Sequence, residues 1–184
     1  MSGLYLAVVA LLAAMLWVIA PPSVVRPTDI TGVALLTYLC MLFLKVLLDD
    51  AVHFADKKKN GENWSHGLGL CIVWNLLALN AIRVTAGDIH LALLCAVLAQ
   101  LIGTVWIVQN YIHKAPEAGY NDRQRHIGWA YINLLSAAVL AVLNTYVATA
   151  QPWLTIAMLS VLTFLVLFDA LYFGTLKRVS GAFN

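Results

Sequence analysis

The stretch TGVALLTYLCMLFLKVLLDDAVH, residues 31–53, decides the fold class of this chain. It contains no charged side chain before Lys45, and Asp49 and Asp50 follow only near its end. A helix of about 20 mostly apolar residues spans the hydrocarbon core of a bilayer, which is roughly 30 Å thick. The stretch is therefore predicted to be a transmembrane helix.

The whole chain has the same apolar character. Of its 184 residues, 62% are hydrophobic and 11% are charged, and the mean hydropathy is +0.84. An ordinary soluble domain is about 45–50% apolar and about 25% charged. The net charge of +2 is too small and too dispersed for a nucleic-acid-binding surface. We therefore expect the lipid bilayer, and no nucleic acid, as a partner of this protein.

Six segments are apolar and long enough to cross the membrane. They are residues 3–20, 31–53, 66–83, 89–112, 127–149 and 153–175. Pro21, Pro22 and Pro27 interrupt the chain after the first segment, and Pro152 suits the first turn of the sixth. Since no long segment is left over, residues 1–184 are predicted to form a single domain, an all-α bundle of six transmembrane helices.

Lysine and arginine positions predict the orientation of this bundle, because cytoplasmic loops are enriched in both. Eight basic residues fall after the second or fourth segment or in the C-terminal tail: Lys57, Lys58, Lys59, Lys114, Arg123, Arg125, Lys177 and Arg178. The opposite side has Arg26 and Arg83 alone. Both termini are thus predicted to be cytoplasmic, in the cytoplasmic membrane of a bacterium or an archaeon. Trp64, Trp129 and Trp153 are interpreted as interfacial anchors.

Ionisable residues inside a membrane segment are energetically costly and mark candidate functional sites. Lys45, Asp49 and His53 are four residues apart and share one helix face. Asp169 follows a long apolar run in the sixth segment, so it is expected to face the bundle, either protonated or paired with Lys45. We interpret Lys45, Asp49, Asp50 and Asp169 as a candidate gate or proton relay. A structural ion pair, or simple exposure at the interface, is the alternative for these residues.

Three amides fall nearer the middle of the membrane: Asn75, Gln100 and Asn133. Polar side chains at this depth usually form hydrogen bonds across helices, each contributing about 0.6–2 kcal/mol. The three amides are therefore predicted either to form such hydrogen bonds across helices or to line a polar path from the outer face to the cytoplasmic polar layer.

Histidines form a second pattern. They occur in two pairs with the same internal spacing, 60 residues apart along the chain: His53 with His66, and His113 with His126. Asp49 precedes the first pair and Gln109 the second, which suggests a weak repeat of two helical hairpins. The four histidines and Asp49 are candidate metal ligands, and this mixed nitrogen and oxygen set suits copper, iron or zinc. A proton relay, a position at the membrane interface beside a basic loop, or a subunit contact is the alternative for the histidines.

The spacing Asp49-x3-His53-x12-His66 resembles the copper-binding Asp/His/His set of the C subunit of copper membrane monooxygenases. That family has a second set, of an amide and two histidines, on the next hairpin. The corresponding residues here are Gln109 or Asn110, His113 and His126. The resemblance implies a copper-binding subunit, and it is confined to these residues, since the flanking residues and the gap between the sets differ.

The sequence leaves three functions open. The first is a small transporter or channel subunit for a proton, a metal cation or a small polar solute. Six short helices leave little room for a pore, so this function favours a homo-oligomer. The second is a metal-binding subunit of a redox enzyme, and the third is a non-catalytic scaffold subunit of a larger membrane complex. P-loop, GxSxG and HExxH motifs are absent, so no catalytic residue is assigned and enzymatic activity stays undecided.

Overall fold

The computed structural model of the chain describes residues 2–19, 29–59, 67–114, 120–147 and 151–172. These residues form helices, with no strand among them, so the predicted all-α fold class is confirmed. The helices are α1 (Ser2–Ile19), α2 (Ile30–Lys59), α3 (Leu68–Val84), α4 (Ile89–Lys114), α5 (Tyr120–Tyr146) and α6 (Pro152–Tyr172).

Four of the helices are long and apolar enough to cross a membrane. The spans are Ile30–Phe54, Ile89–Asn110, His126–Tyr146 and Pro152–Tyr172. The described parts of α1 and α3 contain shorter apolar stretches, Tyr5–Met15 and Leu68–Val84. The composition of these helices supports a helical membrane protein. Six crossings, cytoplasmic termini and a single domain stay predictions.

Two predicted helix boundaries are wrong. α2 continues to Lys59 instead of ending at residue 53, and α5 begins at Tyr120 instead of residue 127. Neither glycine nor proline occurs between His53 and Lys59, so nothing in the sequence stops the helix where the apolar run ends. The basic residues expected in loops at 57–59, 114, 123 and 125 therefore belong to helices.

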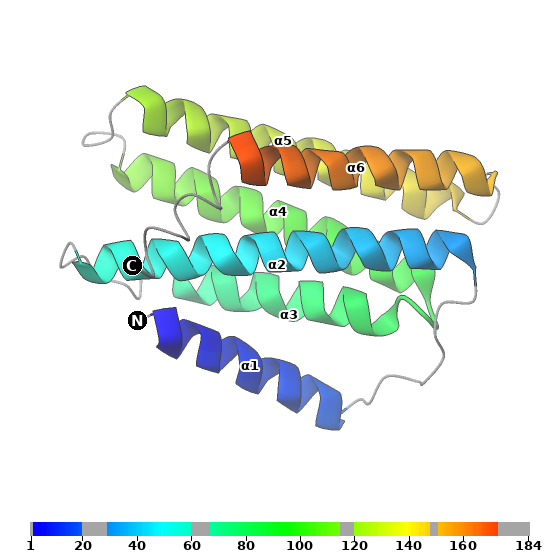
Figure 1. Cartoon of the computed structure of the whole chain (residues 1–184), viewed down its shortest axis with the longest axis horizontal. Helices are drawn as coiled ribbons and strands as arrows, with labels where there is room; N and C mark the ends of the chain where they lie inside the picture. The colour runs from blue at the N-terminus through cyan, green and yellow to red at the C-terminus, as the bar shows by residue number, and fades with distance from the viewer. Residues whose placement is uncertain (1, 20–28, 60–66, 115–119, 148–150, 173–184) are drawn as a thin grey trace.

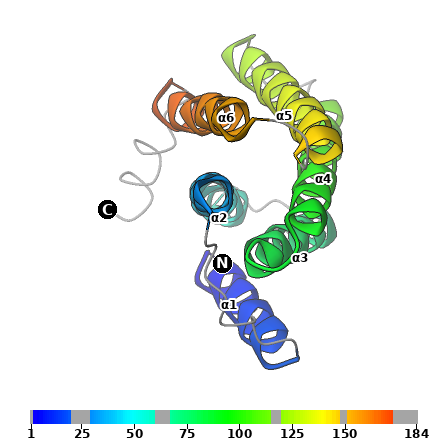
Figure 2. The ribbon, with the colours of Figure 1, turned by 90° about the vertical axis from the view of Figure 1, so that its right-hand side faces the viewer.

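Successive helices run in opposite directions, so α1 begins and α6 ends at the same end of the bundle (Figure 1). Seen along the bundle, the other five helices form an arc around α2 (Figure 2). α2 contributes Leu35 and Tyr38 to the core, both fully buried. Leu140 of α5 and Leu162 of α6 are buried in the same core cluster. This central position lets side chains on different sides of α2 contact different neighbours.

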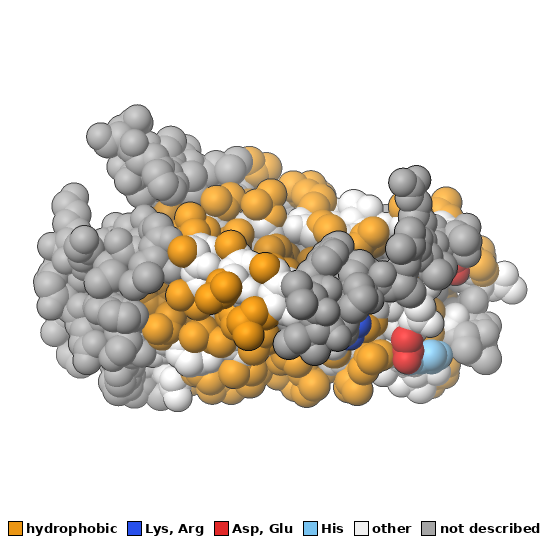
Figure 3. Space-filling model, turned by 90° about the horizontal axis from the view of Figure 1, so that it is seen from below, with side chains coloured by type: hydrophobic (Ala, Val, Ile, Leu, Met, Phe, Trp, Pro, Cys, Tyr) orange, Lys and Arg blue, Asp and Glu red, His pale blue; other side chains and the backbone are white. Residues whose placement is uncertain are grey.

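The outer surface is apolar. Figure 3 shows apolar side chains over the middle of the molecule, while the charged and histidine side chains coloured in that view lie nearer one end. Large side chains point outward from several helices, including Leu44, Tyr131, Val161 and Phe164. A continuous apolar exterior of this kind is favourable in contact with lipid and would promote aggregation in water.

Candidate functional site

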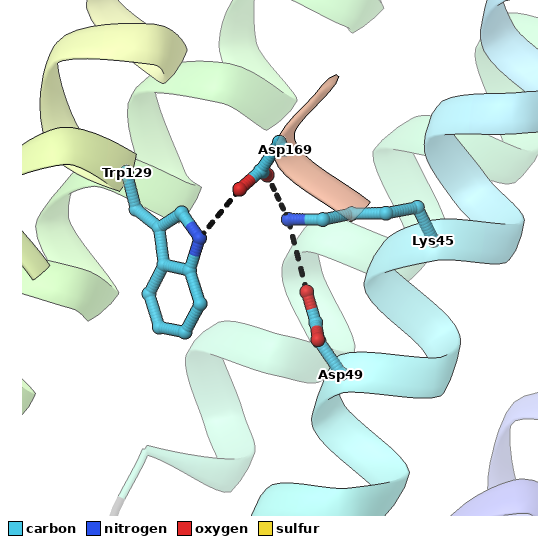
Figure 4. Close-up of polar contacts among 4 residues, drawn as sticks. All are labelled: Lys45, Asp49, Trp129 and Asp169. Carbon is cyan, nitrogen blue, oxygen red and sulfur yellow. Dashed lines mark hydrogen bonds and ion pairs between the residues drawn. The ribbon is translucent and has the colours of Figure 1, made fainter. Parts of the chain in front are cut away.

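The polar layer expected from the sequence is centred on Lys45, a buried cation on α2. Asp49 follows one helical turn later, and its Oδ2 lies 2.9 Å from the Lys45 ammonium nitrogen. The same ammonium also forms an ion pair with Oδ2 of Asp169 on α6 (Figure 4). The side chains of Lys45 and Asp169 are only 12% and 6% exposed. Of the two alternatives for Asp169, the structure thus shows the ion pair.

Trp129 of α5 completes this group of residues. Its indole Nε1 donates a hydrogen bond of 2.7 Å to Oδ1 of Asp169, so both carboxylate oxygens have partners. The Lys45 ammonium lies 5.5 Å from the centre of the Trp129 ring, within the range of a cation–π contact. Sequence reasoning interpreted Trp129 as an interfacial anchor and missed this role. We call Lys45, Asp49, Trp129 and Asp169 the Lys45 cluster.

The Lys45 cluster has an unequal set of charges. One ammonium serves two carboxylates, one on its own helix and one on α6, so the ionised cluster carries an excess negative charge. Charge-assisted hydrogen bonds are stronger than neutral ones, and they strengthen further where water is excluded. The cluster therefore holds α2, α5 and α6 together.

Asp50 belongs to a different group on another side of α2. Tyr5 of α1 donates a hydrogen bond of 2.8 Å to Asp50 Oδ2. The Tyr5 oxygen in turn accepts a hydrogen bond of 2.9 Å from Nδ2 of Asn75 on α3. Asp50 and Asn75 are 2% and 0% exposed. We call these three residues the Tyr5 cluster. The sequence treated Asp49 and Asp50 as one group, whereas in the structure Asp49 pairs with Lys45 of its own helix and Asp50 contacts Tyr5 of α1.

The other two mid-membrane amides also lie between helices. Gln100 of α4 donates a hydrogen bond of 3.0 Å to the hydroxyl of Tyr38 on α2, and both side chains are buried. Asn133 of α5 lies against Gly103 of α4, where an added Cβ would be 3.0 Å from Asn133 Nδ2. In Asn75 and Gln100, therefore, the amide nitrogen donates a hydrogen bond to a tyrosine hydroxyl of another helix.

The histidines are only partly described. The His53 ring lies 5.2 Å from the Trp106 ring of α4, and the His126 ring lies 5.6 Å from that of Trp129. His66 and the side chain of His113 lie outside the described residues. Within the part of the chain that is described, no group of three or more His, Cys, Asp or Glu residues is arranged to hold a metal ion. The metal site predicted from Asp49 and the histidines stays a prediction.

Comparison with known proteins gives no match, whether to protein-family models, to curated protein sequences or to solved structures.

Proposed function

We propose that this protein is a small membrane transporter or channel subunit for a proton, a metal cation or a small polar solute. The observation that supports this function best is the Lys45 cluster, in which one buried ammonium is shared by carboxylates on two helices. Ionisable groups are costly within a membrane and usually serve a pathway, a relay or a counter-ion. We expect the protein to act as a homo-oligomer or within a larger membrane complex.

The arrangement of polar groups suggests where a solute would move. Tyr38, Lys45 and Asp49 are seven and four residues apart, so they lie on nearly the same face of α2. Tyr38 contacts Gln100 of α4, and Lys45 contacts Asp169 of α6. This face of α2 therefore carries polar groups from the interior of the bundle toward the end where α2 terminates, and we propose it as the wall of the pathway.

The gating step follows from the excess negative charge of the cluster. A proton or cation that binds Asp169 or Asp49 neutralises part of the negative charge that the Lys45 ammonium otherwise balances. The ion pair between α2 and α6 then weakens, because the ammonium is no longer needed by both carboxylates. Arrival of the transported or coupled ion is thus linked to separation of these two helices at the cluster.

Flux through reconstituted protein tests this function. Asp169→Asn and Asp49→Asn keep the size of each side chain but remove its charge, and each is expected to lower flux at least about tenfold, which corresponds to about 1.4 kcal/mol. The measurement uses proteoliposomes with entrapped dyes sensitive to protons, Na⁺, K⁺ or Zn²⁺.

The matched control is Asp88→Asn. Asp88 is exposed and its Oδ1 accepts a 2.9 Å hydrogen bond from the Leu91 amide at the start of α4. Asparagine caps helices as well as aspartate does, so the control changes charge without removing the cap. Flux that is the same in Asp49→Asn, Asp169→Asn and wild-type protein would contradict a gating role for the cluster.

A metal-binding subunit of a redox enzyme is the second candidate, favoured by one contact. His53 packs on Trp106, which joins the end of α2 to α4. Asn110, one helical turn after Trp106, is also buried. The contact of His53 with Trp106 joins the helix that carries Asp49 and His53 to the helix that carries Asn110. Against this candidate, Asp49 is already paired with Lys45.

Elemental analysis separates the second candidate from the first. If the second is correct, protein purified without a histidine tag and kept above pH 7 should contain about one copper, iron or zinc ion per chain, since histidine ligands bind metal only when deprotonated. His126→Ala and His53→Ala should each lower this content. A metal content well below one per chain would reject the redox function and leave the transport proposal untouched.

A further inference from the structure

The Tyr5 cluster contains buried oxygen atoms that lack hydrogen-bond partners. They are Oδ1 of Asp50 and Oδ1 of Asn75, on residues that are 2% and 0% exposed. Buried polar atoms in folded proteins nearly always have a partner, and an exception calls for an explanation such as a bound ion. Both unpartnered oxygens belong to residues that are hydrogen-bonded to the same group, the hydroxyl of Tyr5.

The hydrogen bonds of Asn75 show that its unpartnered atom is an acceptor, and Oδ1 of an ionised Asp50 is an acceptor too. Nδ2 of Asn75 donates to the Tyr5 oxygen at 2.9 Å and to the Cys71 carbonyl at 2.7 Å, which fixes the direction of the amide and leaves Oδ1 without a donor. The Tyr5 proton is already donated to Asp50 Oδ2. The Cys71 thiol lies beside the Asp50 carboxylate, but a thiol is a weak donor and Oδ1 stays without a hydrogen bond.

The Asp50 carboxylate also has no ion-pair partner among the described side chains. Lys45, the cation of the neighbouring cluster, forms its ion pairs with Asp49 and Asp169. None of the ion pairs among the described side chains reaches Asp50. A buried carboxylate without a cation is unfavourable, because burial removes the water that would stabilise its charge. The Tyr5 cluster therefore lacks a hydrogen-bond donor for these two oxygen atoms and a cation in direct contact with Asp50.

We propose that the Tyr5 cluster binds a monovalent cation between Asp50 Oδ1, Asn75 Oδ1 and the Tyr5 oxygen. Carboxylate, amide and hydroxyl oxygens are hard ligands, which suit hard cations better than transition metals. A single carboxylate balances a single positive charge, and this favours an alkali cation over a divalent one. The site lies on a different side of α2 from the Lys45 cluster and does not depend on the transport proposal.

Sodium is the probe for this site. Purified full-length protein in detergent is equilibrated with radioactive ²²Na⁺, and ionic strength is held constant with choline chloride. We expect saturable binding of about one Na⁺ per chain, because the cluster supplies one carboxylate. Asp50→Asn should abolish the binding. Tyr5→Phe removes only one hydroxyl group, so it keeps the packing of α1 and should weaken Na⁺ binding at least about tenfold by removing one ligand.

Two further variants separate this site from the proposed gate. Asp88→Asn should bind Na⁺ like the wild type, as an exposed carboxylate unconnected with either cluster. Asp169→Asn should also bind Na⁺ normally even where its flux is lost, since Asp169 contacts Lys45 and Trp129. Lost flux with normal Na⁺ binding in Asp169→Asn is the result expected from both proposals. Unchanged flux in this variant contradicts the gate alone, and Na⁺ binding that is equal in Asp50→Asn and wild-type proteins contradicts the cation site alone.

Two results would overturn the cation site. One is ²²Na⁺ binding that is equal in wild-type, Tyr5→Phe and Asp50→Asn proteins. The other is an infrared carbonyl band of a protonated carboxylic acid that Asp50→Asn removes and that Na⁺ does not change, because Asp50 would then hold a proton in place of the cation.

Discussion

Replacing Lys45 by methionine is expected to lower the free energy of unfolding by about 3–5 kcal/mol, the usual cost of leaving buried charges without their partner. Methionine fills a similar volume but removes the ammonium that Asp49 and Asp169 share. The two carboxylates then lose the cation that they share, although Asp169 keeps its hydrogen bond from Trp129. Unfolding of the purified protein in mixed micelles with increasing SDS, followed by tryptophan fluorescence, measures the effect.

The matched variant is the triple change Lys45→Met, Asp49→Asn and Asp169→Asn. It removes the whole charge group, so most of the lost stability should return, whereas flux in proteoliposomes should stay low. If Lys45→Met lowered the free energy of unfolding by less than about 1 kcal/mol, the loss would be no larger than that of an exposed ion pair. This result would contradict the burial of the cluster. Recovery of both stability and flux in the triple variant would contradict the transport role.

Replacing Gly103 by leucine is expected to destabilise the contact of α4 with α3 and α5 by about 1–3 kcal/mol or more, the usual cost of overpacking a core. A Cβ at this position would lie 3.0 Å from Nδ2 of Asn133 and 3.3 Å from Nε1 of Trp74. The further atoms of leucine have no room unless these helices move apart. Small residues at helix contacts allow this close approach in membranes.

Gly69→Leu on α3 is the matched control. An added Cβ there meets nothing within 4 Å, and Gly69 is exposed. Leucine is also a better helix former than glycine, by up to about 1 kcal/mol, so this variant should be neutral or stabilising. Equal unfolding curves for Gly103→Leu and Gly69→Leu would contradict the close packing of α3, α4 and α5.

Apolar runs were sufficient to predict the helices but not all of their ends. A prediction from apolar runs finds only the residues that lipid can cover, and in the second segment the apolar run ends near His53. The helix itself continues to Lys59, because its hydrogen bonds depend on the absence of glycine and proline and not on apolar side chains. The same distinction explains why α5 begins among polar residues at Tyr120.

The contacts of Lys45 with Asp49 and with Asp169 could be predicted from the sequence, whereas the other contacts between helices could not. The pair of Lys45 and Asp49 follows from a spacing of four residues. Asp50 was grouped with Asp49 because the two are adjacent, yet one residue turns a helix by about 100° and changes the neighbour.

The aromatic partners of the acids could not be recognised from residue type. Tyr5 lies 45 residues from Asp50 and 70 from Asn75 along the chain, and no local pattern connects them. Trp129 is 40 residues from Asp169. Tyrosine and tryptophan are common at membrane interfaces, so their identity indicates depth in the bilayer and not the acid that they contact.

The pairing of Lys45 with Asp49 also bears on how the chain is made. A ribosome completes α2 long before α6, so at the time α2 enters the membrane Asp169 has not yet been synthesised. A lone lysine or aspartate near the centre of an inserting helix costs about 2.5–3.5 kcal/mol. Because Lys45 and Asp49 are one turn apart on the same helix, they can neutralise each other during insertion without help from later segments. The last helix then brings Asp169 to an ammonium that already has one partner.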